Sequence, residues 1–415
     1  MKVSPILIAI PAFFLFIAIE LIIGWRKRQK LYRFNDAITN LNIGIGSQVF
    51  GAFSKAALLA LYILVYDSLA IIHQPTTWWS FVLALFTFDF IFYWAHRWGH
   101  ETNIFWGAHV VHHQSEEYNL SVALRQSWIH NIIAFVLFLP MPVLGFDPKI
   151  FLAAAATHTL YQFWIHTKTI KKMPRIIEFL FNTPSHHRVH HGVNPKYIDK
   201  NHGGVFIIWD RLFGTFQAEE EEPTYGITTQ LKSWNPVWAN SHYYIEMFQR
   251  ARQMKWADRI KLVFAKPGWL PDYLGGYQAP PEVDKANYKA YDTQTTLSRN
   301  VYVFVQFLMI AVGLAAYMFY FPTISLFFQI VFFGILILST LICGAILENK
   351  RWVVYIEYLR LMLIGISLNS FYYYWYMHWF TVVLVVSCVA FILFALWFTL
   401  SWLFDKQWFP EAIRK

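Results

Sequence analysis

Charged residues are scarce in this chain. Asp, Glu, Lys and Arg together make up 14% of its 415 residues, against about 25% in an ordinary soluble domain. Hydrophobic residues make up 57%, aromatic residues 20%, and the mean hydropathy is +0.37. A soluble globule of this size could not keep so much apolar surface away from water, and a disordered or collagen-like chain would not carry it. The composition therefore predicts an integral membrane protein.

Cysteine is almost absent, and so are the common nucleotide-binding motifs. The two cysteines, Cys343 and Cys388, lie inside apolar runs, which argues against a disulfide scaffold or a thiolate metal site. No Gly-x-Gly-x-x-Gly or P-loop pattern occurs, so no nicotinamide, flavin or ATP site is expected. The net charge of +9 comes without a basic recognition motif. It therefore argues against a nucleic-acid partner and favours a surface that faces anionic lipid.

Apolar runs of membrane-spanning length alternate with short polar turns. The first run is followed at once by Arg26, Lys27 and Arg28, which places its end in the cytosol. Counting crossings from there returns the third run to the cytosolic side at His96. Two shorter runs, 132–145 and 150–165, predict a helical hairpin that enters the bilayer and returns. The long runs cover residues 6–25, 43–72, 78–95, 301–321, 324–347, 353–374 and 380–404.

Histidine is unusually frequent in one part of the chain. Of 16 histidines, 13 fall between His96 and His202. Residues three and four positions apart share one face of a helix, so a histidine cluster with this spacing points its imidazoles at one place. Each cluster lies near the cytosolic end of an apolar run, and we expect them to converge. The three clusters are His96-Arg-Trp-Gly-His100, His109-Val-Val-His112-His113 and His187-Arg-Val-His190-His191.

These clusters hold too many imidazoles for one metal ion. A structural zinc ion takes four ligands and a catalytic one takes three, so eight imidazoles indicate two ions with open positions. Iron, zinc, copper and nickel all accept imidazole, and the ligand type alone leaves the metal open. His166 is a ninth predicted ligand. Weaker candidates are His158, His130, His186 and His202, whereas His73, His242 and His378 are expected at interfaces without a metal.

Other metalloproteins do not fit the spacing. A zinc protease requires His-Glu-x-x-His, and no such histidine follows His100-Glu101. The Glu-x-x-His pairs of soluble di-iron bundles are missing as well.

The sequence around the clusters resembles the fatty acid hydroxylase / sterol desaturase superfamily of membrane di-iron oxidoreductases, over roughly residues 80–225. The strings Leu160–Thr167, Asn182–Gly192 and Trp209–Phe216 are most similar to its alkylglycerol monooxygenases. This resemblance implies a monooxygenase with two non-haem irons that hydroxylates the ether-linked carbon of alkylglycerol-type lipids with O2. The hydroxylated ether then collapses to a fatty aldehyde and a glycerol product. The resemblance also implies a tetrahydropterin as the reductant.

The resemblance carries over to individual histidines as iron ligands. Gln162 departs from the pattern, since related desaturases and fatty acid 2-hydroxylases have a histidine there, four residues before His166. The histidines that match the superfamily boxes are His96, His100, His109, His112, His113, His187, His190 and His191, and His166 matches a further family histidine.

Three charged residues near the clusters are candidates for other roles. Asp89 lies seven residues before His96, two turns deeper on the same face, and a carboxylate in an apolar helix needs a partner. We expect Asp89 to orient a ligand imidazole through its second nitrogen. Glu101 adjoins His100 and is predicted to reach a metal, a water or the pterin ring, as a catalytic and cofactor-binding residue. Arg125 is either an ordinary interfacial arginine or a ligand of a lipid headgroup.

These patterns predict an all-α integral membrane protein, a multi-span helical bundle with a cytosolic di-iron site at the membrane rim. The expected segments are N-terminal membrane helices (1–76), a fatty acid hydroxylase-type catalytic domain (77–225), a cytosolic or interfacial segment (226–300) and a four-helix membrane block (301–415). The acidic run Glu219–Glu222 is predicted to be a solvated loop face. The membrane is that of the endoplasmic reticulum or a bacterial inner membrane.

Two other functions stay open at this point. A hydroxylase or desaturase of sterol, fatty acyl or carotenoid chains would use the same kind of site. A metal transporter or sensor would also carry histidines, but transporters place polar groups at the bilayer midplane rather than at its rim. The expected partners are a lipid substrate, O2, the bilayer and, if no pterin serves, a docked redox donor protein.

Overall fold

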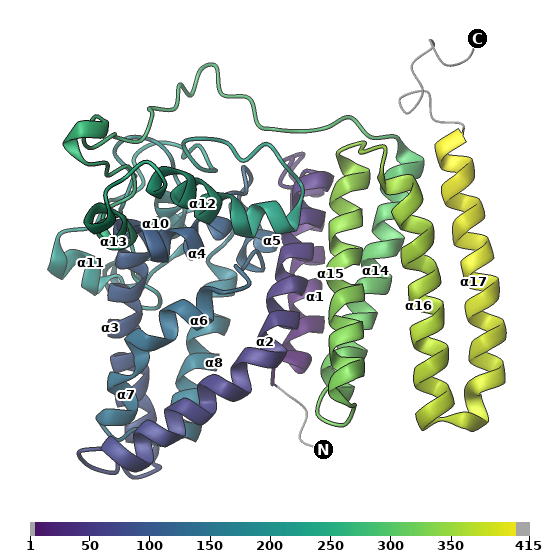
Figure 1. Cartoon of the computed structure of the whole chain (residues 1–415). Helices are drawn as coiled ribbons and strands as arrows, with labels where there is room; N and C mark the ends of the chain where they lie inside the picture. The colour runs from purple at the N-terminus through teal and green to yellow at the C-terminus, as the bar shows by residue number, and fades with distance from the viewer. Residues whose placement is uncertain (1–4, 404–415) are drawn as a thin grey trace. The chain divides into compact units, whose positions relative to one another are not determined.

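The computed structural model describes residues 5–403 (Figure 1). Within that range the chain forms helices and loops, and the strand-like pairings are two isolated bridges, Phe181 with Phe206 and Gly192 with Tyr225. The prediction of an all-α protein is confirmed. The last residue of the predicted run 380–404 lies outside the described range.

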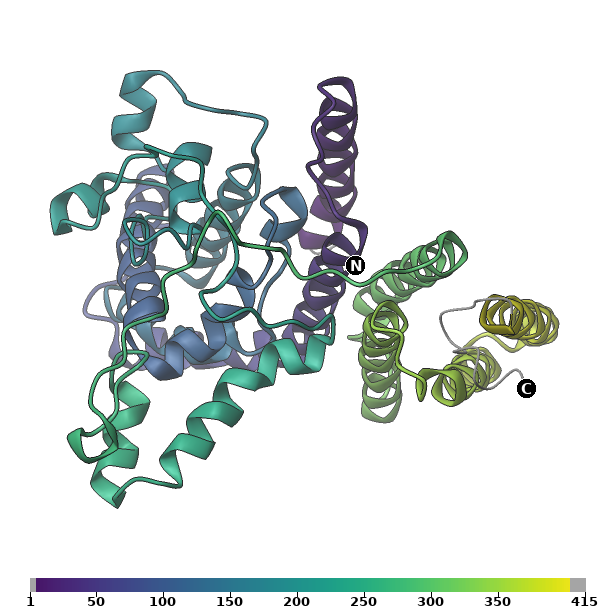
Figure 2. The ribbon, with the colours of Figure 1, turned by 90° about the horizontal axis from the view of Figure 1, so that it is seen from above.

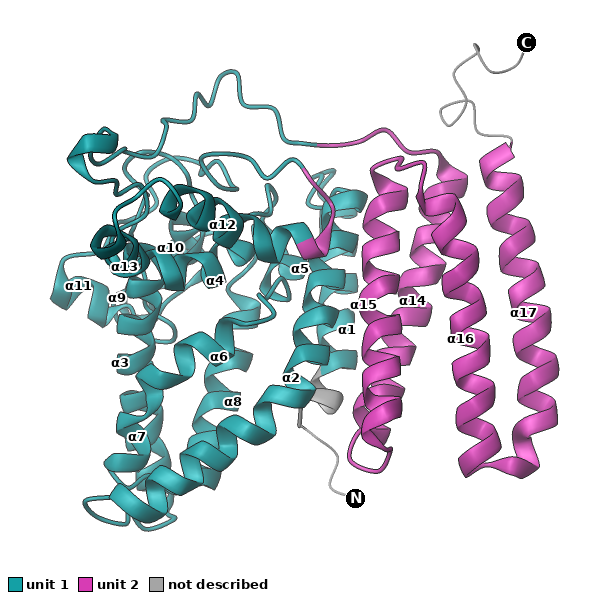
Figure 3. Cartoon of the chain, viewed as in Figure 1, with its two compact units in different colours: residues 1–232, 238–291 teal, residues 233–237, 292–415 magenta. Residues whose placement is uncertain are grey.

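The chain divides into two compact units (Figure 3). The histidine unit comprises residues 1–232 and 238–291, and the C-terminal unit comprises residues 233–237 and 292–415. The four-segment division stays a prediction, since compactness measures contacts and not function.

Long helices form the apolar part of the histidine unit. They are α1 (Pro5–Arg26), α2 (Phe34–Leu69), α3 (Trp78–Glu101) and α8 (Pro148–Trp164). Helices α3 and α8 pack side by side, and a buried core joins Tyr62 of α2, Phe88 of α3 and Phe151 of α8. Helices α2 and α3 are long and apolar enough to cross a membrane. This core therefore anchors α3, whose last turn carries His100.

The predicted helical hairpin has an irregular first arm. It consists of α6 (His130–Ala134), the 3-10 helix η1 (Phe135–Phe138) and α7 (Pro140–Val143), and the second arm is α8. Pro140 and Pro142 lack a backbone N–H and therefore interrupt the helical hydrogen bonds. Gly145 turns the chain with a φ of +81°, and a Cβ there would lie 1.6 Å from the carbonyl oxygen of Ile72. The two arms are as predicted, but the first is not one continuous helix.

Short helices form a layer around the end of α3 that carries the histidines, as the view in Figure 2 shows from above. They position most of the site residues. They are α4 (Asn103–His113), α5 (Leu120–Ala123), α9 (Arg175–Leu180), α10 (Pro184–His190), α11 (Ile208–Phe213), α12 (Pro236–Ala251), α13 (Trp256–Phe264) and η2 (Asp272–Leu274).

Four long helices make up most of the C-terminal unit: α14 (Leu297–Tyr320), α15 (Leu326–Leu347), α16 (Val353–Trp375) and α17 (Met377–Leu403). Each packs against the next, and all four are long and apolar enough to cross a membrane. With α2 and α3, six such helices occur among the described residues. The expectation of a multi-pass membrane protein is confirmed.

Candidate metal centre

Nine histidines from four parts of the histidine unit converge at the end of α3. They form two groups, and within each group one ring nitrogen per residue lies within 4.8 Å of the others. The nine are the nine predicted ligands, whose role as ligands stays a prediction. The first group is His96, His100, His109, His113 and His190, and the second group is His112, His166, His187 and His191.

The start of α10 fixes the direction of three of these side chains. Thr183 caps the helix in a capping box with the side chain of His186, and Pro184 occupies the first turn, where its missing N–H costs nothing. The helix therefore begins at a defined residue. Four positions later than His187, the C-cap residue His191 comes onto the same side and completes the second group.

Backbone carbonyls orient the outer nitrogens of four histidines. The Nδ1 atoms of His96 and His190 lie 2.7 and 2.9 Å from the carbonyl oxygens of His202 and Lys200. Those of His112 and His166 lie 3.0 and 2.8 Å from the carbonyl oxygens of Arg125 and Gln162. A carbonyl oxygen only accepts, so each Nδ1 carries the proton, and in a neutral ring Nε2 is left with a free lone pair.

The inner nitrogens face one another. In the second group, Nε2 of His166 lies 3.2 Å from Nε2 of His112 and 3.0 Å from Nε2 of His187. His112 and His166 both have Nδ1 protonated, so neither neutral ring has an Nε2 proton to donate. Burial lowers the pKa of His112 to about 4, which disfavours an imidazolium in this pair. Two opposed lone pairs at this distance repel unless a cation lies between them.

The separations fit ligands of one metal ion. Two nitrogens about 2.1 Å from an ion and at a right angle to each other lie about 3.0 Å apart, whereas the tetrahedral angle gives about 3.4 Å. In the first group, Nε2 of His109 lies 2.9 Å from that of His96 and 3.0 Å from that of His113. These distances are short enough for the nitrogens to share one ion. The donor set therefore fits two metal ions.

The centre is buried and has unused acceptors. All nine histidines are at most 8% exposed. Among the described residues, Nε2 of His100 and Nε2 of His190 are buried without a hydrogen-bond partner. A buried polar atom without a partner is costly, and both atoms belong to the first group. A metal ion would satisfy them.

A loop that we call the orienting loop, residues 199–202, serves the first group. Its carbonyls accept from His96 and His190, and Oδ1 of Asp199 lies 3.5 Å from Nδ1 of His100. Asp199 and Asn201 both have a φ of 56°, a left-handed conformation that Asp and Asn tolerate better than most residues. Three of the five rings in the group thus depend on four consecutive residues. The sequence does not reveal this loop, because main-chain carbonyls leave no side-chain signature.

The buried carboxylate of Asp210 fixes the end of this loop. It accepts from the backbone N–H groups of His202 and Gly203, both at 2.7 Å. Burial raises the pKa of Asp210 to about 6, although the hydroxyl of Thr215 and these two N–H groups oppose the shift.

Asp89 acts at a greater distance than expected. Its carboxylate lies 2.9 Å from Nε2 of His158 and accepts from the backbone N–H of Val205 at 2.6 Å and from Nε1 of Trp209 at 2.9 Å. It therefore contacts none of the nine clustered histidines, and His158 is its partner rather than a member of either group. The close approach requires Gly204, where a Cβ would lie 2.2 Å from Nε2 of His158. Asp89 holds the segment that follows the orienting loop.

Glu101 and Arg125 have protein partners. Glu101 forms an ion pair with Arg97 at 3.1 Å and belongs to neither histidine group. Arg125 is buried and donates to the carbonyl oxygen of Val111 and to Oε1 of Gln114, both at 2.6 Å. The two predicted roles of Arg125, at the interface or on a headgroup, are therefore wrong. The reason is that burial and these acceptors hold it under α4, where its own carbonyl orients His112.

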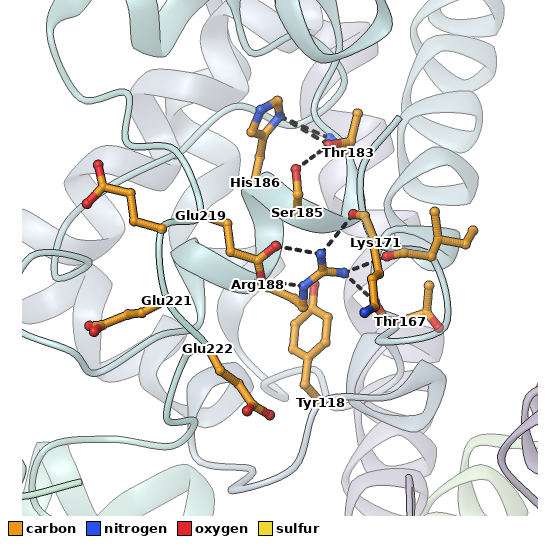
Figure 4. A network of polar contacts seen from close by, with 12 residues as sticks. Tyr118, Thr167, Lys171, Thr183, Ser185, His186, Arg188, Glu219, Glu221 and Glu222 are labelled. Atoms are coloured by element: carbon orange, nitrogen blue, oxygen red, sulfur yellow. Dashed lines mark hydrogen bonds and ion pairs between the residues drawn. The ribbon is translucent and has the colours of Figure 1, made fainter. Parts of the chain in front are cut away.

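Arg188 forms a clamp on the second group (Figure 4). Its Nε and Nη2 donate to the two carboxylate oxygens of Glu219, both at 2.6 Å. Its other donors reach the carbonyl oxygens of Thr167, Ile170 and Lys171 at 3.0, 2.7 and 2.8 Å. The clamp thus ties α10, which carries His187, to the segment directly after His166.

This clamp corrects the interpretation of the acidic run. Glu219 is mostly buried and bound bidentately, and Glu221 accepts from Asn194 at 2.7 Å. Glu220, Glu221 and Glu222 are exposed as predicted, and Glu220 meets Lys196 at 3.2 Å, so the prediction of a solvated face is wrong at Glu219. A run of acidic letters does not reveal which carboxylate faces a buried arginine.

The remaining histidines lie outside the two groups. Nε2 of His186 lies 3.1 Å from the carboxylate of Glu178, and Nε2 of His202 faces the carbonyl oxygen of Asp199 at 3.1 Å. The ring of His130 lies 5.7 Å from that of His109. His242 packs beside Tyr243 with Nδ1 3.2 Å from the carbonyl oxygen of Ala239.

The chain matches one protein-family model and is similar in sequence to several known lipid-modifying enzymes. Residues 81–215 match the model of the fatty acid hydroxylase family. The chain is 36% identical to an alkylglycerol monooxygenase of Danio rerio over 73% of this chain and 68% of the relative. It is also 36% identical to an alkylglycerol monooxygenase of Homo sapiens, over 73% of this chain and 69% of the relative. An ornithine lipid hydroxylase of Rhizobium tropici is 27% identical over 46% of this chain and 59% of the relative. No solved structure matches.

Proposed function

Because the chain belongs to the alkylglycerol monooxygenases of the fatty acid hydroxylase superfamily, we propose that it hydroxylates the ether-linked carbon of alkylglycerol lipids. The observation that supports a metal-dependent oxidation most directly is the pair of buried histidine groups with opposed lone pairs. The substrate assignment rests on the relatives, whose names specify an alkylglycerol.

The metal in this proposal is iron, with one ion in each histidine group. When bound, iron supplies the activation of O2. Each group supplies four or five ring nitrogens within 4.8 Å of one another, and these histidines would hold the ion. The residues of the chain exclude water from the centre, hold each imidazole in one tautomer and fix the angle between rings. Asp89 and Asp210 act as positioning residues behind the orienting loop.

The reaction needs two electrons from outside the lipid. One oxygen atom of O2 enters the C–H bond next to the ether oxygen, and the other leaves as water with two protons and two electrons. The hemiacetal that results separates into a fatty aldehyde and a glycerol product. We propose a tetrahydropterin as the two-electron donor. Glu101, which is partly exposed beside His100, is the proposed contact for its ring.

The proposed orientation puts the histidine centre on the cytosolic side. Its support is the basic stretch from Arg26 to Arg33 after α1 and the basic residues Lys168, Lys171 and Lys172 after α8.

Turnover of a purified, iron-loaded protein in lipid nanodiscs tests this function. The substrate is a long-chain 1-O-alkylglycerol, O2 is the oxidant and tetrahydrobiopterin is the sole reductant. We expect a fatty aldehyde and glycerol in equal amounts, with pterin oxidised in step. The matched acyl ester should give no aldehyde, because its carbonyl carbon has no hydrogen to remove.

Three outcomes would change the proposal. Hydroxylated sterol or fatty acid without aldehyde would favour the alternative substrates. Turnover only with a reductase and a redox protein would reject the pterin. Bound metal without O2 consumption on any lipid would favour a transporter or sensor. Glu101→Gln separates the pterin contact from the rest, since it should raise the KM for pterin and leave the iron content unchanged.

A further inference from the structure

Helix α13 (Trp256–Phe264) presents a large apolar stripe on the side that faces away from the protein. Leu262 is 2% exposed and packs inward, whereas Trp256, Ile260 and Phe264 are 73%, 52% and 66% exposed. The three exposed residues are four positions apart, so they line one face of the helix. A helix that is surrounded by water would carry polar residues there. The stripe therefore indicates apolar surroundings.

Hydrogen bonds tie α13 to the segment just after a candidate membrane span. The backbone N–H of Asn103 donates to the carbonyl oxygen of Ala265 at 2.9 Å, and its side-chain amide donates to that of Leu262 at 2.8 Å. Asn103 comes two residues after the end of α3, one of the six candidate spans. Figure 1 shows α13 beside this end of α3. Helix α13 is thus tied by hydrogen bonds to the segment that directly follows α3.

An exposed tryptophan lies near the end of α3. Trp98, one turn before the end of α3, is 41% exposed. Tryptophan is enriched at the membrane–water interface, where its ring lies at headgroup depth. Trp256 at the start of α13 is a second exposed tryptophan.

The charges around the stripe are mainly basic. Between residues 246 and 266 the chain has six basic and two acidic residues. Lys255 and Arg259 each precede a member of the stripe by one position, and Lys261 follows Ile260. Long basic side chains beside an apolar face can bury their carbon stems while their charges reach lipid phosphates. The pattern fits an anionic membrane surface.

We propose that α13 lies in the headgroup layer of the bilayer, with Trp256, Ile260 and Phe264 inserted and the flanking basic residues bound to anionic lipid headgroups. This surface is independent of the proposed reaction. A docked acidic redox protein would use the same charges, but it would not explain why the stripe lies on a helix that is tied to the segment just after a candidate span.

A site-specific fluorescent label tests the insertion. Ile260→Cys is labelled in the full-length protein with Cys388→Ser as background, since Cys388 is exposed and Cys343 is buried. The protein is placed in nanodiscs of phosphatidylcholine with headgroup-proximal doxyl lipid. We expect several-fold stronger quenching than for a label at Glu282→Cys, which lies on an exposed polar loop. Equal quenching at both positions, or equal access of a water-soluble quencher, would overturn the proposal.

A second comparison tests the charges. Adding phosphatidylserine should deepen the quenching of the Ile260→Cys label. The triple substitution Lys255→Gln, Arg259→Gln and Lys261→Gln should abolish that increase while leaving the quenching in pure phosphatidylcholine. Quenching that ignores phosphatidylserine would reject the anionic headgroups. Shielding of the label only after an acidic redox protein is added would instead identify a protein-docking surface.

Discussion

The two units both bury charged or polar groups inside helices, but they compensate them in different ways. In the C-terminal unit, Nε and Nη2 of Arg360 donate to the two oxygens of Glu357 at 2.7 and 2.6 Å, and Tyr302 donates to the same carboxylate. Each charge there has an opposite charge or a donor beside it. In the histidine unit, two acceptors, Nε2 of His112 and Nε2 of His166, face each other across 3.2 Å.

This difference separates a structural polar network from a binding centre. A buried ion pair that satisfies itself holds helices in register and needs no ligand. A buried set of lone pairs without donors is stable only with a cation. Ionisable groups inside membrane helices are functional candidates by default. Here the presence or absence of partners within the protein distinguishes a structural network from a binding centre.

Removal of one ligand should have the largest effect. His187→Ala or His112→Ala removes one member of the second group without touching an apolar span, so we expect turnover to be abolished and bound iron to fall, with normal membrane insertion. Iron analysis and aldehyde production measure this. His242→Ala is the control, since it lies outside both groups, and should change little. Normal iron and a normal rate in both ligand variants would refute the ligand assignment.

Breaking the Arg360–Glu357 pair of the C-terminal unit should lower the free energy of unfolding but leave the iron content unchanged. Arg360→Met leaves the buried Glu357 without its cation, a change that typically costs about 3–5 kcal/mol. Unfolding of the full chain in detergent should show this loss, while iron per folded molecule stays the same. The double variant with Glu357→Leu should recover most of the stability, because no charge is left unpaired. A loss of iron in the double variant would assign a functional role to the network.

The Arg188 clamp should have an intermediate effect on the second group alone. Arg188→Lys keeps the charge but cannot bind Glu219 bidentately. Residues that support metal ligands from behind typically contribute about 10–100-fold to metal affinity or activity. We therefore expect Arg188→Lys to lower the iron affinity of the second group by about 10–100-fold.

The acidic run supplies a matched control for the clamp. Glu220→Gln changes the exposed ion pair with Lys196 and should alter neither iron nor rate, whereas Glu219→Gln should resemble Arg188→Lys. If the two glutamine variants behave alike, the clamp has no role in the centre.

As the pH is lowered, the metal-free protein should lose stability at a higher pH than the metal-loaded protein. Burial lowers the pKa of His112 from 6.5 to about 4, so the unfolded chain binds this proton at a higher pH than the folded chain does. Stability that is present above pH 6.5 is therefore lost as the pH falls towards 4. Bound metal keeps the imidazoles neutral and should delay the loss. Thermal unfolding of chelated and iron-loaded protein across this range measures the difference, and identical curves would contradict it.

The sequence alone determined the class of protein and the set of histidines that converge. Apolar runs of spanning length and the short polar turns between them predicted the membrane helices, because membrane helices require continuous apolar length. The spacing of His109, His112 and His113 predicted one face of a helix. The nine predicted ligands are the nine histidines that converge, since the identity of a ligand is a property of its side chain.

The tertiary structure decided how those side chains are divided and oriented. His112 and His113 are neighbours in the sequence but belong to different groups, because adjacent positions point about 100° apart on a helix. The carbonyls that orient His96 and His190 come from residues 202 and 200, in a loop outside the helices that carry the two rings, and any residue type supplies a carbonyl. The partners of Asp89, Arg125 and Glu219 were missed for the same reason: a partner is set by three-dimensional proximity, which local spacing does not encode.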